Sequence, residues 1–296
     1  MRAFPVIAVL VMLPAYGVAG RPEPSRPVPP SRHVPASRHV PAKKWACVAA
    51  DNGAANPGPS CPGPPSNGYH YRGITNSNGY TTFVNNDMWN PPGAGHPQTI
   101  YANNPGDWKV VSDQAKGNTS VLSYPSVQQV FTLTADSPAP VSGFGTLLSD
   151  YTESMPRGGD NEAAYDMWLG TSETTAYSQE VMIWVDDHRT NPPPGKVAAR
   201  VSFFGVRFTV WDDASSSPGT IYFVRDHSAK SSRVHIITML KWLENRGLAP
   251  RGSGINDIEF GWEICSTDGH PWTFTISRYR LTARCAKASS TACWSA

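Results

Sequence analysis

The sequence predicts an all-β sandwich that carries a single packed helix. Between residues 45 and 285, short runs of β-branched and aromatic residues alternate with clusters of Gly, Pro, Asn and Ser. Such frequent turn signals between short strands are typical of a sandwich or a barrel. The predicted strands cover residues 80–84, 127–134, 163–169, 180–185, 198–206, 221–225, 255–264 and 272–281.

One segment departs from the strand pattern and predicts the helix. Apolar residues recur at helical spacing from Val234 onward, after Ser231 and Ser232, and Gly247 closes the segment. No internal break in the pattern divides residues 45–285. We therefore expect this range to fold as one domain.

The two ends of the chain differ in composition from this domain. Residues 1–20 predict a secretory signal peptide, because a basic residue precedes an apolar run from Val6 to Leu13 and small residues follow it. The alternative is an uncleaved amphipathic tail. Residues 21–44 are rich in Pro and poor in large apolar side chains, which predicts a disordered linker. Residues 286–296 are assigned to a C-terminal tail. We expect a secreted, extracellular protein.

Five cysteines fit an exported chain that forms disulfides. Cys47 with Cys61, and Cys285 with Cys293, would each close a short loop and leave Cys265 over. The connectivity stays open at this stage, because sequence alone does not settle it.

Composition and missing motifs exclude several classes of function. The formal net charge is only +2, which gives no reason to expect nucleic acid or an anionic membrane as a partner. No phosphate-binding loop, serine-hydrolase signature or structural-zinc spacing is present in the sequence. We predict no cofactor and no metal.

Alternation along residues 179–186 separates two kinds of side chain, because successive residues of a strand point to opposite faces. One face is apolar and suits a core: Val181, Ile183 and Val185. The other face carries Glu180, Met182, Trp184 and Asp186. A face that mixes carboxylates with a thioether and an indole indicates a ligand groove.

The same division recurs in two other predicted strands. In residues 257–265 the expected core face consists of Ile258, Phe260, Trp262 and Ile264. The opposite face consists of Glu259, Gly261, Glu263 and Cys265. Gly261 removes a side chain where something approaches closely. In residues 164–169, Asp166 and Trp168 share a face.

Acids on the non-core faces of central strands, accompanied by tryptophans, fit the cleavage of sugars. Aromatic rings offer flat apolar surfaces to pyranose rings, and two carboxyl groups in different environments can serve as nucleophile and proton donor. The alternative is that Glu180 and Glu263 are ordinary solvent-facing strand residues, since antiparallel sheets normally have one wet face.

Five segments, in order along the chain, carry a family resemblance. These are residues 84–90, Asn-rich and containing Trp; 123–127, Ser-Tyr-Pro-Ser-Val; 164–169, with Tyr-Asp; 180–185, Glu-Val-Met-Ile-Trp-Val; and 260–263, Phe-Gly-Trp-Glu. Together they resemble glycoside hydrolase family 12. The resemblance does not extend to the Pro-rich leader.

The resemblance implies a β-jelly-roll of two curved antiparallel sheets, whose concave sheet forms an open cleft. It also implies a retaining mechanism. Glu180 matches the nucleophile of the family, and Glu263 matches the acid/base. Asp166 would form a hydrogen bond with the nucleophile.

The resemblance further implies residues that contact substrate. Trp89 would stack on a glucosyl unit, and Met182 would lie under the cleft. Trp184 and Trp168 share the faces of the acids and are further candidates. Asp87 stands where the family has Asn, so the polar contact made there is an open question.

These expectations add up to a secreted endo-β-1,4-glucanase that acts as a monomer on β-glucan polysaccharides. Cellulose, mixed-linkage glucan and xyloglucan all remain open as substrates, as does the balance between hydrolysis and transglycosylation. Two alternatives remain: a non-catalytic carbohydrate-binding sandwich, and a surface structural protein tethered by the Pro-rich arm.

Overall fold

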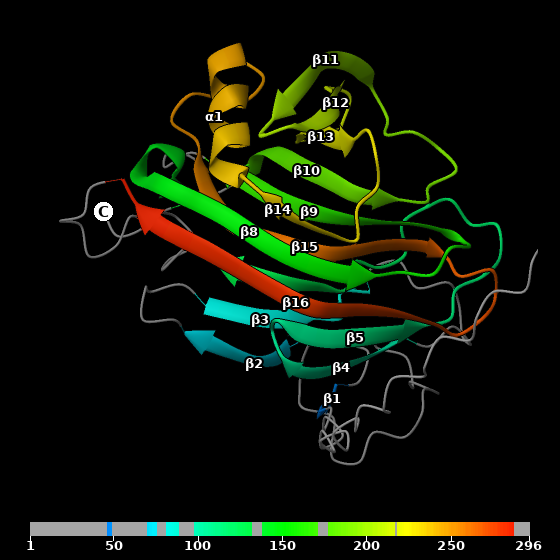
Figure 1. Ribbon diagram of the computed structural model, residues 1–296. Coiled ribbons are helices and arrows are strands. Elements are labelled where there is room, and N and C mark those ends of the chain that lie inside the picture. The colour runs from blue at the N-terminus through cyan, green and yellow to red at the C-terminus, as the bar shows by residue number, and fades with distance from the viewer. Residues whose placement is uncertain are drawn as a thin grey trace, which may run out of the picture. The chain divides into compact units, whose positions relative to one another are not determined.

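The computed structural model divides the chain into two units, Met1–Ala42 and Lys43–Ala296 (Figure 1). The structure describes residues 46–48, 70–75, 81–88, 98–131, 138–170, 177–216 and 218–286. The predicted signal peptide and linker lie outside the described residues, as does nearly all of the predicted C-terminal tail. The assignment of these segments stays a prediction.

Two β-sheets form the described part of the second unit. The six-stranded sheet has the order β1 (Ala46–Val48), β4 (Gln98–Asn104), β5 (Asp107–Ser112), β16 (Trp272–Cys285), β8 (Phe144–Ser154) and β14 (Ser231–Val234). In Figure 1, β8 and β16 of this sheet lie in front of β9 and β15 of the second sheet.

The ten-stranded sheet carries the predicted site. Its order is β11 (Lys196–Phe203), β12 (Val206–Asp213), β13 (Gly219–Arg225), β10 (Tyr177–Asp187), β9 (Asp160–Gly170), β15 (Gly254–Ser266), β6 (Ser126–Val130), β3 (Thr81–Asn85) and β2 (His70–Thr75), with β7 (Ala139–Pro140) paired to β15. The predicted all-β fold of two sheets and one helix is confirmed.

One strand pair departs from the predicted antiparallel arrangement. Strands β10 and β13 are parallel, with Glu180 opposite Thr220 and Met182 opposite Tyr222. The hairpins β11–β12 and β12–β13 reverse the chain twice, so β13 returns to the edge of β10 in the direction of β11. The expectation of fully antiparallel sheets is therefore wrong at this pair.

The core lies between the two sheets and contains the predicted apolar residues. Val181, Ile183 and Val185 on β10, and Ile258, Phe260, Trp262 and Ile264 on β15, are all at most 1% exposed. Phe260 lies 4.5 Å from Tyr165 and 5.5 Å from Tyr279 between ring centroids, and so joins the two sheets. Burial of these large side chains contributes about 1.5–3 kcal/mol each to folding.

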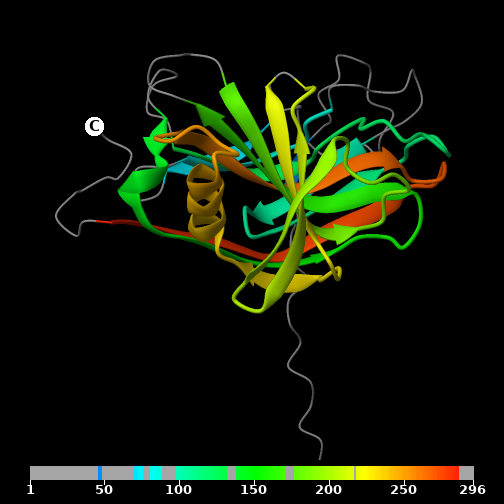
Figure 2. The same cartoon turned by 90° about the horizontal axis from the view of Figure 1, so that it is seen from above.

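The helix α1 (Ile236–Arg246) forms later than the sequence predicts. Ser231–Val234 pair with β8 instead of opening the helix. Gly247 ends the helix with φ of 70°, and its N–H bonds to the carbonyl of Glu244, as glycine permits in the left-handed region. Figure 2 shows α1 beside β8. The apolar face of the helix joins the core through Ile236, Met239, Leu240 and Leu243.

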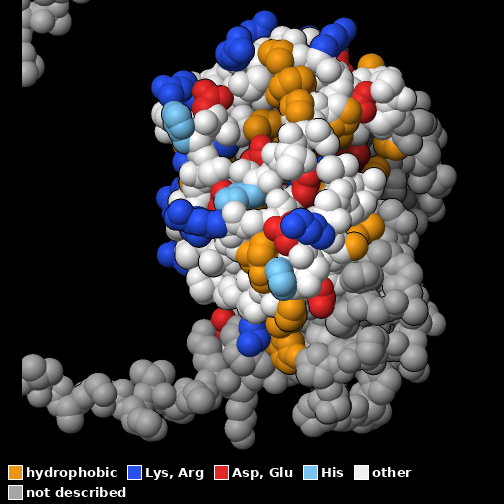
Figure 3. Space-filling model, turned by 90° about the vertical axis from the view of Figure 1, so that its right-hand side faces the viewer, with side chains coloured by type: hydrophobic (Ala, Val, Ile, Leu, Met, Phe, Trp, Pro, Cys, Tyr) orange, Lys and Arg blue, Asp and Glu red, His pale blue; other side chains and the backbone are white. Residues whose placement is uncertain are grey.

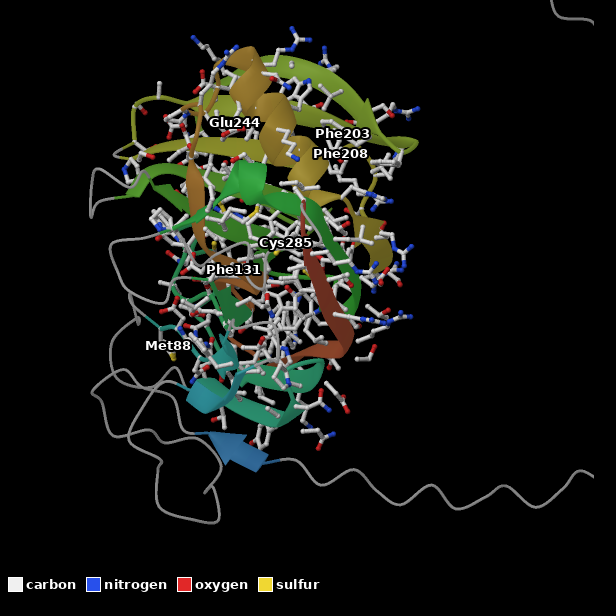
Figure 4. The ribbon with its side chains drawn as sticks, turned by 90° about the vertical axis from the view of Figure 1, so that its left-hand side faces the viewer. Met88, Phe131, Phe203, Phe208, Glu244 and Cys285 are labelled. Carbon is white, nitrogen blue, oxygen red and sulfur yellow. The ribbon has the colours of Figure 1, made fainter. Side chains whose placement is uncertain are left out.

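Phe203 and Phe208 extend this core to the β11–β12 hairpin. Figure 4 shows both rings beside α1. Their centroids are 6.3 Å apart, and Phe203 also meets Trp242 of α1 at 6.2 Å. A short 3₁₀ turn, Val141–Gly143, leads into β8. No helix in the described ranges is long and apolar enough to cross a membrane.

Two cysteines bear on the prediction that Cys265 is left over when the other cysteines form disulfides. Cys285 is disulfide-bonded. Cys265 is a free cysteine and is fully buried.

Candidate active site

Three neighbouring strands, β10, β9 and β15, hold the predicted carboxyl groups. In the register of these strands, Met182 lies opposite Asp166, Asp166 opposite Glu259, and Glu162 opposite Glu263. We call the side of the ten-stranded sheet that faces away from the core the outer face. A small apolar cluster on it, separate from the main core, consists of Ala164, Met182, Trp184 and Tyr222.

Gly261 is required because another part of the chain approaches it closely. A Cβ atom at this position would lie 2.0 Å from the carbonyl oxygen of Pro125 and 2.7 Å from the Cα of Ser126. The predicted close approach is thus confirmed, and the approaching group is the backbone at the start of β6. The contact fixes β6 beside β15, so that Ser126 reaches Glu259.

Glu180 is held by a hydroxyl group from the parallel strand. Thr220 Oγ1 donates to Glu180 Oε2 at 2.7 Å. Burial raises the pKa of Glu180, the Thr220 hydrogen bond lowers it, and the charge of Glu263 raises it. Glu180 and Glu263 therefore interact electrostatically although 83 positions separate them in the sequence.

Asp166 is a buried carboxyl beside Glu180. Its side chain is 8% exposed, and its Oδ1 has no hydrogen-bond partner among the described residues. Burial is the main cause that holds the pKa of Asp166 well above its usual range, and the negative charge of Glu180 is the second. A protonated Asp166 can donate a hydrogen bond, so the predicted bond from Asp166 to Glu180 is compatible with this environment and stays a prediction.

Glu259 and Asp257 add two further acids to the outer face. Glu259 Oε2 accepts hydrogen bonds from Ser126 Oγ at 2.9 Å and from Gln128 Nε2. Burial and the charge of Asp257 raise the pKa of Glu259 well above its usual range. Burial raises the pKa of Asp257 to about 7. This part of the face therefore favours neutral carboxyl groups in the absence of a ligand.

Glu263 is held by an ion pair. Arg189 Nη1 lies 3.2 Å from Glu263 Oε2 and 3.0 Å from Glu162 Oε2. Neither partner of Glu263 was predicted from the sequence. Glu162 lies two residues before Ala164, so strand alternation places it on the same face as Ala164 and Asp166. This signal could have identified it. Arg189 follows the end of β10 in a loop, and no strand pattern signals its position.

The aromatic candidates lie on the outer face, but one of them is covered. Trp184 is 3% exposed, with the ring of Tyr222 at 5.6 Å and the guanidinium of Arg189 at 5.7 Å from its centroid. Met182 is 2% exposed, while Trp168 is half-buried opposite Glu180. Met182 and Trp184 thus form a floor to the site, and Trp168 is the more open of the two tryptophans.

Asp87 follows β3 in a constrained backbone conformation. Its φ is 24°, and its N–H donates to Asn85 Oδ1 at 3.2 Å. Burial raises the pKa of Asp87 to about 6. Trp89, the predicted stacking residue, lies outside the described residues, so its position stays a prediction.

Asp186 does not share the outer face with Glu180, and that expectation is wrong. A β-bulge between Trp184 and Asp186 shifts the register, so that Asp186 lies opposite the core residue Ala163. Asp186 is 2% exposed, and its charge adds to burial, which is the main cause that raises the pKa of the buried Glu153. Sequence alternation alone did not reveal the extra residue.

The charges of the described surface are mixed. On the side shown in Figure 3, acidic and basic side chains are interspersed, in keeping with the small net charge. Among the described residues no group of three His, Cys, Asp or Glu side chains is arranged to hold a metal ion.

No family model matches the sequence. Endoglucanase S of Pectobacterium parmentieri is 27% identical over 205 residues, which cover 63% of this chain and 77% of that protein.

The fold resembles solved structures of xyloglucanases, one of them a family 12 enzyme. A family 12 xyloglucanase from Bacillus licheniformis matches with a TM-score of 0.59 and 23% identity over 69% of this chain and 93% of that one. The xyloglucanase domain of NopAA, a type three effector from Sinorhizobium fredii solved with cellobiose, matches with a TM-score of 0.59 and 23% identity over 72% and 99% of the two chains. The predicted resemblance to glycoside hydrolase family 12 is thus confirmed, by a sequence match to an endoglucanase and by a shared fold.

Proposed function

We propose that this protein is a secreted glycoside hydrolase that cleaves internal β-1,4-glucosidic bonds of β-glucans with retention of configuration. The observation that carries the proposal is that Glu180 on β10 and Glu263 on β15 project from the outer face on either side of β9, and that the charge of Glu263 acts on Glu180. Retaining hydrolysis of a glycoside requires two carboxyl groups that face the same substrate-binding space.

In the proposed mechanism Glu180 is the nucleophile. Its carboxylate attacks the anomeric carbon while Glu263 protonates the departing glycosidic oxygen. Glu263 then removes a proton from water, which displaces Glu180 from the glycosyl-enzyme. Asp166 stays protonated and donates to Glu180, which favours the ionised nucleophile and carries no charge of its own to repel it.

Three features favour a β-glucan as the substrate. The sequence is similar to an endoglucanase, and the fold is that of xyloglucanases, one of which was solved with cellobiose. The half-buried Trp168 lies opposite Glu180, where an indole can contact a pyranose ring. Trp89, in its predicted role, would add a stacking surface. The protein would act extracellularly after removal of its leader.

The test is a product assay on carboxymethyl-cellulose, mixed-linkage glucan and xyloglucan. Glu180→Gln and Glu263→Gln should each abolish most of the reducing-sugar release. Glu244→Gln is a matched control, because it makes the same change in a glutamate that belongs to α1 and not to β9, β10 or β15. Proton NMR of the first product should show the β-anomer before mutarotation.

Two outcomes would contradict the proposal. Full release of reducing sugar by either active-site variant would remove these residues from the mechanism. Binding of glucan by wild type without any cleavage would favour the non-catalytic carbohydrate-binding sandwich instead.

A further inference from the structure

Arg189 is the only cation that contacts three carboxyl groups among the described residues. Its Nε lies 2.8 Å from Asp160 Oδ1, and its Nη1 lies 3.0 Å from Glu162 Oε2 and 3.2 Å from Glu263 Oε2. The remaining nitrogen, Nη2, donates to the carbonyl of Thr119 at 3.1 Å. The side chain is 11% exposed. The cluster therefore contains three acids and one positive charge in a largely desolvated position.

Glu162 is the member of this cluster that is least able to carry a charge. It is fully buried, and its Oε1 has no hydrogen-bond partner among the described residues. Its Oε2 shares one nitrogen, Arg189 Nη1, with Glu263 Oε2, so the two carboxyl groups are close neighbours. Two carboxyl groups that share a site cannot both ionise at low cost.

We propose that Glu162 and Glu263 share one proton beside Arg189. The two carboxyl groups then act together as the general acid of the reaction. Glu263 transfers the proton, and Glu162 and Arg189 are positioning residues. The inference rests on the proposed role of Glu263. It names a neighbouring carboxyl, Glu162, that can supply a proton to the acid step, since an isolated Arg–Glu pair favours the ionised acid.

The electrostatics of the pair agree with this assignment. Burial, then the charge of Glu263 and a hydrogen bond with it, hold the pKa of Glu162 well above its usual range, while Arg189 opposes the shift. The titratable and charged groups that face the pair are Asp160 and Asp166 on β9, Glu180 on β10, Arg189 in the following loop, Tyr222 on β13, Cys265 on β15, and Tyr124 before β6. All except Arg189 are acids or are neutral, so this environment favours retention of the shared proton.

The proton balance follows the two steps of the reaction. In the first, Glu263 gives its proton to the leaving oxygen as the C1–O bond breaks and the bond from C1 to Glu180 forms. The pair then holds no proton, and Arg189 stabilises the two carboxylates. In the second step water attacks C1, the bond to Glu180 breaks, and the proton of water returns to Glu263. The pair thus ends as it began, with one proton.

Two substitutions should shift the pH dependence in opposite directions. Glu162→Gln removes the neighbouring negative charge, so Glu263 ionises more readily and the alkaline limb of kcat/KM on a cello-oligosaccharide should move down by roughly 1–3 pH units. Arg189→Gln removes the positive charge, so that limb should move up. Loss of folding stability alone cannot produce shifts of opposite sign.

Two controls isolate the proton transfer. Glu153→Gln also replaces a buried glutamate, but on the core side, and should leave both limbs in place. With a 2,4-dinitrophenyl cellobioside, whose leaving group departs without a proton, Glu162→Gln and wild type should share the same alkaline limb.

A measurement on wild type keeps the test independent of the variants. In protein labelled with ¹³C at the Glu carboxyl carbons, the Glu162 and Glu263 resonances should follow the same two titration steps. Independent single-step titrations, or an unshifted alkaline limb in a folded and active Glu162→Gln variant, would overturn the inference. Wild type that cleaves no β-glucan would instead reject the proposed function.

Discussion

The two faces of strands β9, β10 and β15 differ in what they contribute. The inner face is apolar and closely packed, and its large side chains are at most 1% exposed. The outer face collects carboxyl groups, including Asp166, Glu162 and Glu259, whose pKa values burial raises. Burying ionisable groups costs free energy. The outer face is therefore arranged for something other than stability, which is the physical argument for a site there.

The outer face is itself divided between its two proposed catalytic residues. Glu180 receives a hydrogen bond from a neutral hydroxyl, Thr220, and lies beside the buried acid Asp166. Glu263 lies against a cation, Arg189, which also holds Glu162. This asymmetry suits two different tasks, because a nucleophile must be ionised and an acid/base must change its protonation during the reaction.

The largest expected effect is the loss of activity when either carboxyl is removed. Glu180→Gly should lower kcat about 10⁴-fold or more, because the covalent intermediate is lost. Glu263→Ala should lower it about 10²–10⁴-fold on polymeric glucan, the range of a lost general acid.

The stereochemistry of azide products distinguishes the two roles. With an activated aryl cellobioside, azide should rescue Glu180→Gly and give the α-glycosyl azide, because it replaces the nucleophile in a single displacement. Azide with Glu263→Ala should give the β-glycosyl azide through the glycosyl-enzyme. The same anomer from both variants, identified by NMR, would reject the assignment.

The core supplies a second prediction, on stability. Burial raises the pKa of Glu153 from 4.5 to about 8, and Trp262 Nε1 donates to its Oε2 at 3.2 Å. Because the pKa is higher in the folded state than in the unfolded state, the stabilising contribution of protonated Glu153 is complete below pH 4.5 and is lost as the pH rises toward 8.

Urea denaturation between these pH values should therefore give a free energy of unfolding that falls by a few kcal/mol, on the order that such a pKa difference allows. Glu153→Gln should make this dependence less steep while leaving the pH profile of activity unchanged. An equally steep dependence in the variant would mean that another group is responsible.

Thr220→Val is expected to have a smaller, specific effect at the nucleophile. The Thr220 hydrogen bond lowers the pKa of Glu180, so its removal raises that pKa. Since the nucleophile must be ionised, the acid limb of kcat/KM should move to higher pH by about one unit, from a hydrogen bond of about 1.5 kcal/mol to a charged group. Thr220→Ser retains the hydroxyl and is the matched control. A limb that shifts equally in both variants would indicate repacking.

Strand alternation predicted the faces of β10 and β15 because their inner positions are uniformly apolar. It could not predict strand β8, where Ser149 and Glu153 point inward and interrupt the hydrophobic pattern. Ser149 accepts a hydrogen bond from the hydroxyl of Tyr165 at 2.8 Å, and Glu153 accepts one from Trp262. Partners that lie on other strands satisfy these polar groups, and such partners are invisible until the strands are assembled.

The candidate site shows the same limit. The three carboxyl groups Asp166, Glu180 and Glu263 were predictable, because they lie within regular strands and within segments that resemble a family. The bulge that turns Asp186 inward, and the loop that brings Arg189 back over β15, depend on backbone irregularity and tertiary contact. A prediction from alternation assumes regular strands, so it detects neither the bulge nor the loop.

The smallest expected effect concerns Cys265, which lies at the Glu263 end of the outer face. Its side chain is fully buried, and burial raises the pKa of its thiol well above the usual value. The thiolate is the reactive form, so native protein should resist iodoacetamide near neutral pH although the thiol is free. Mass spectrometry should detect alkylation at Cys265 only after denaturation. Rapid alkylation of native protein with loss of activity would mean that this end of the face opens to solvent, and the shared proton proposed for Glu162 and Glu263 would then lack the dry surroundings on which it depends.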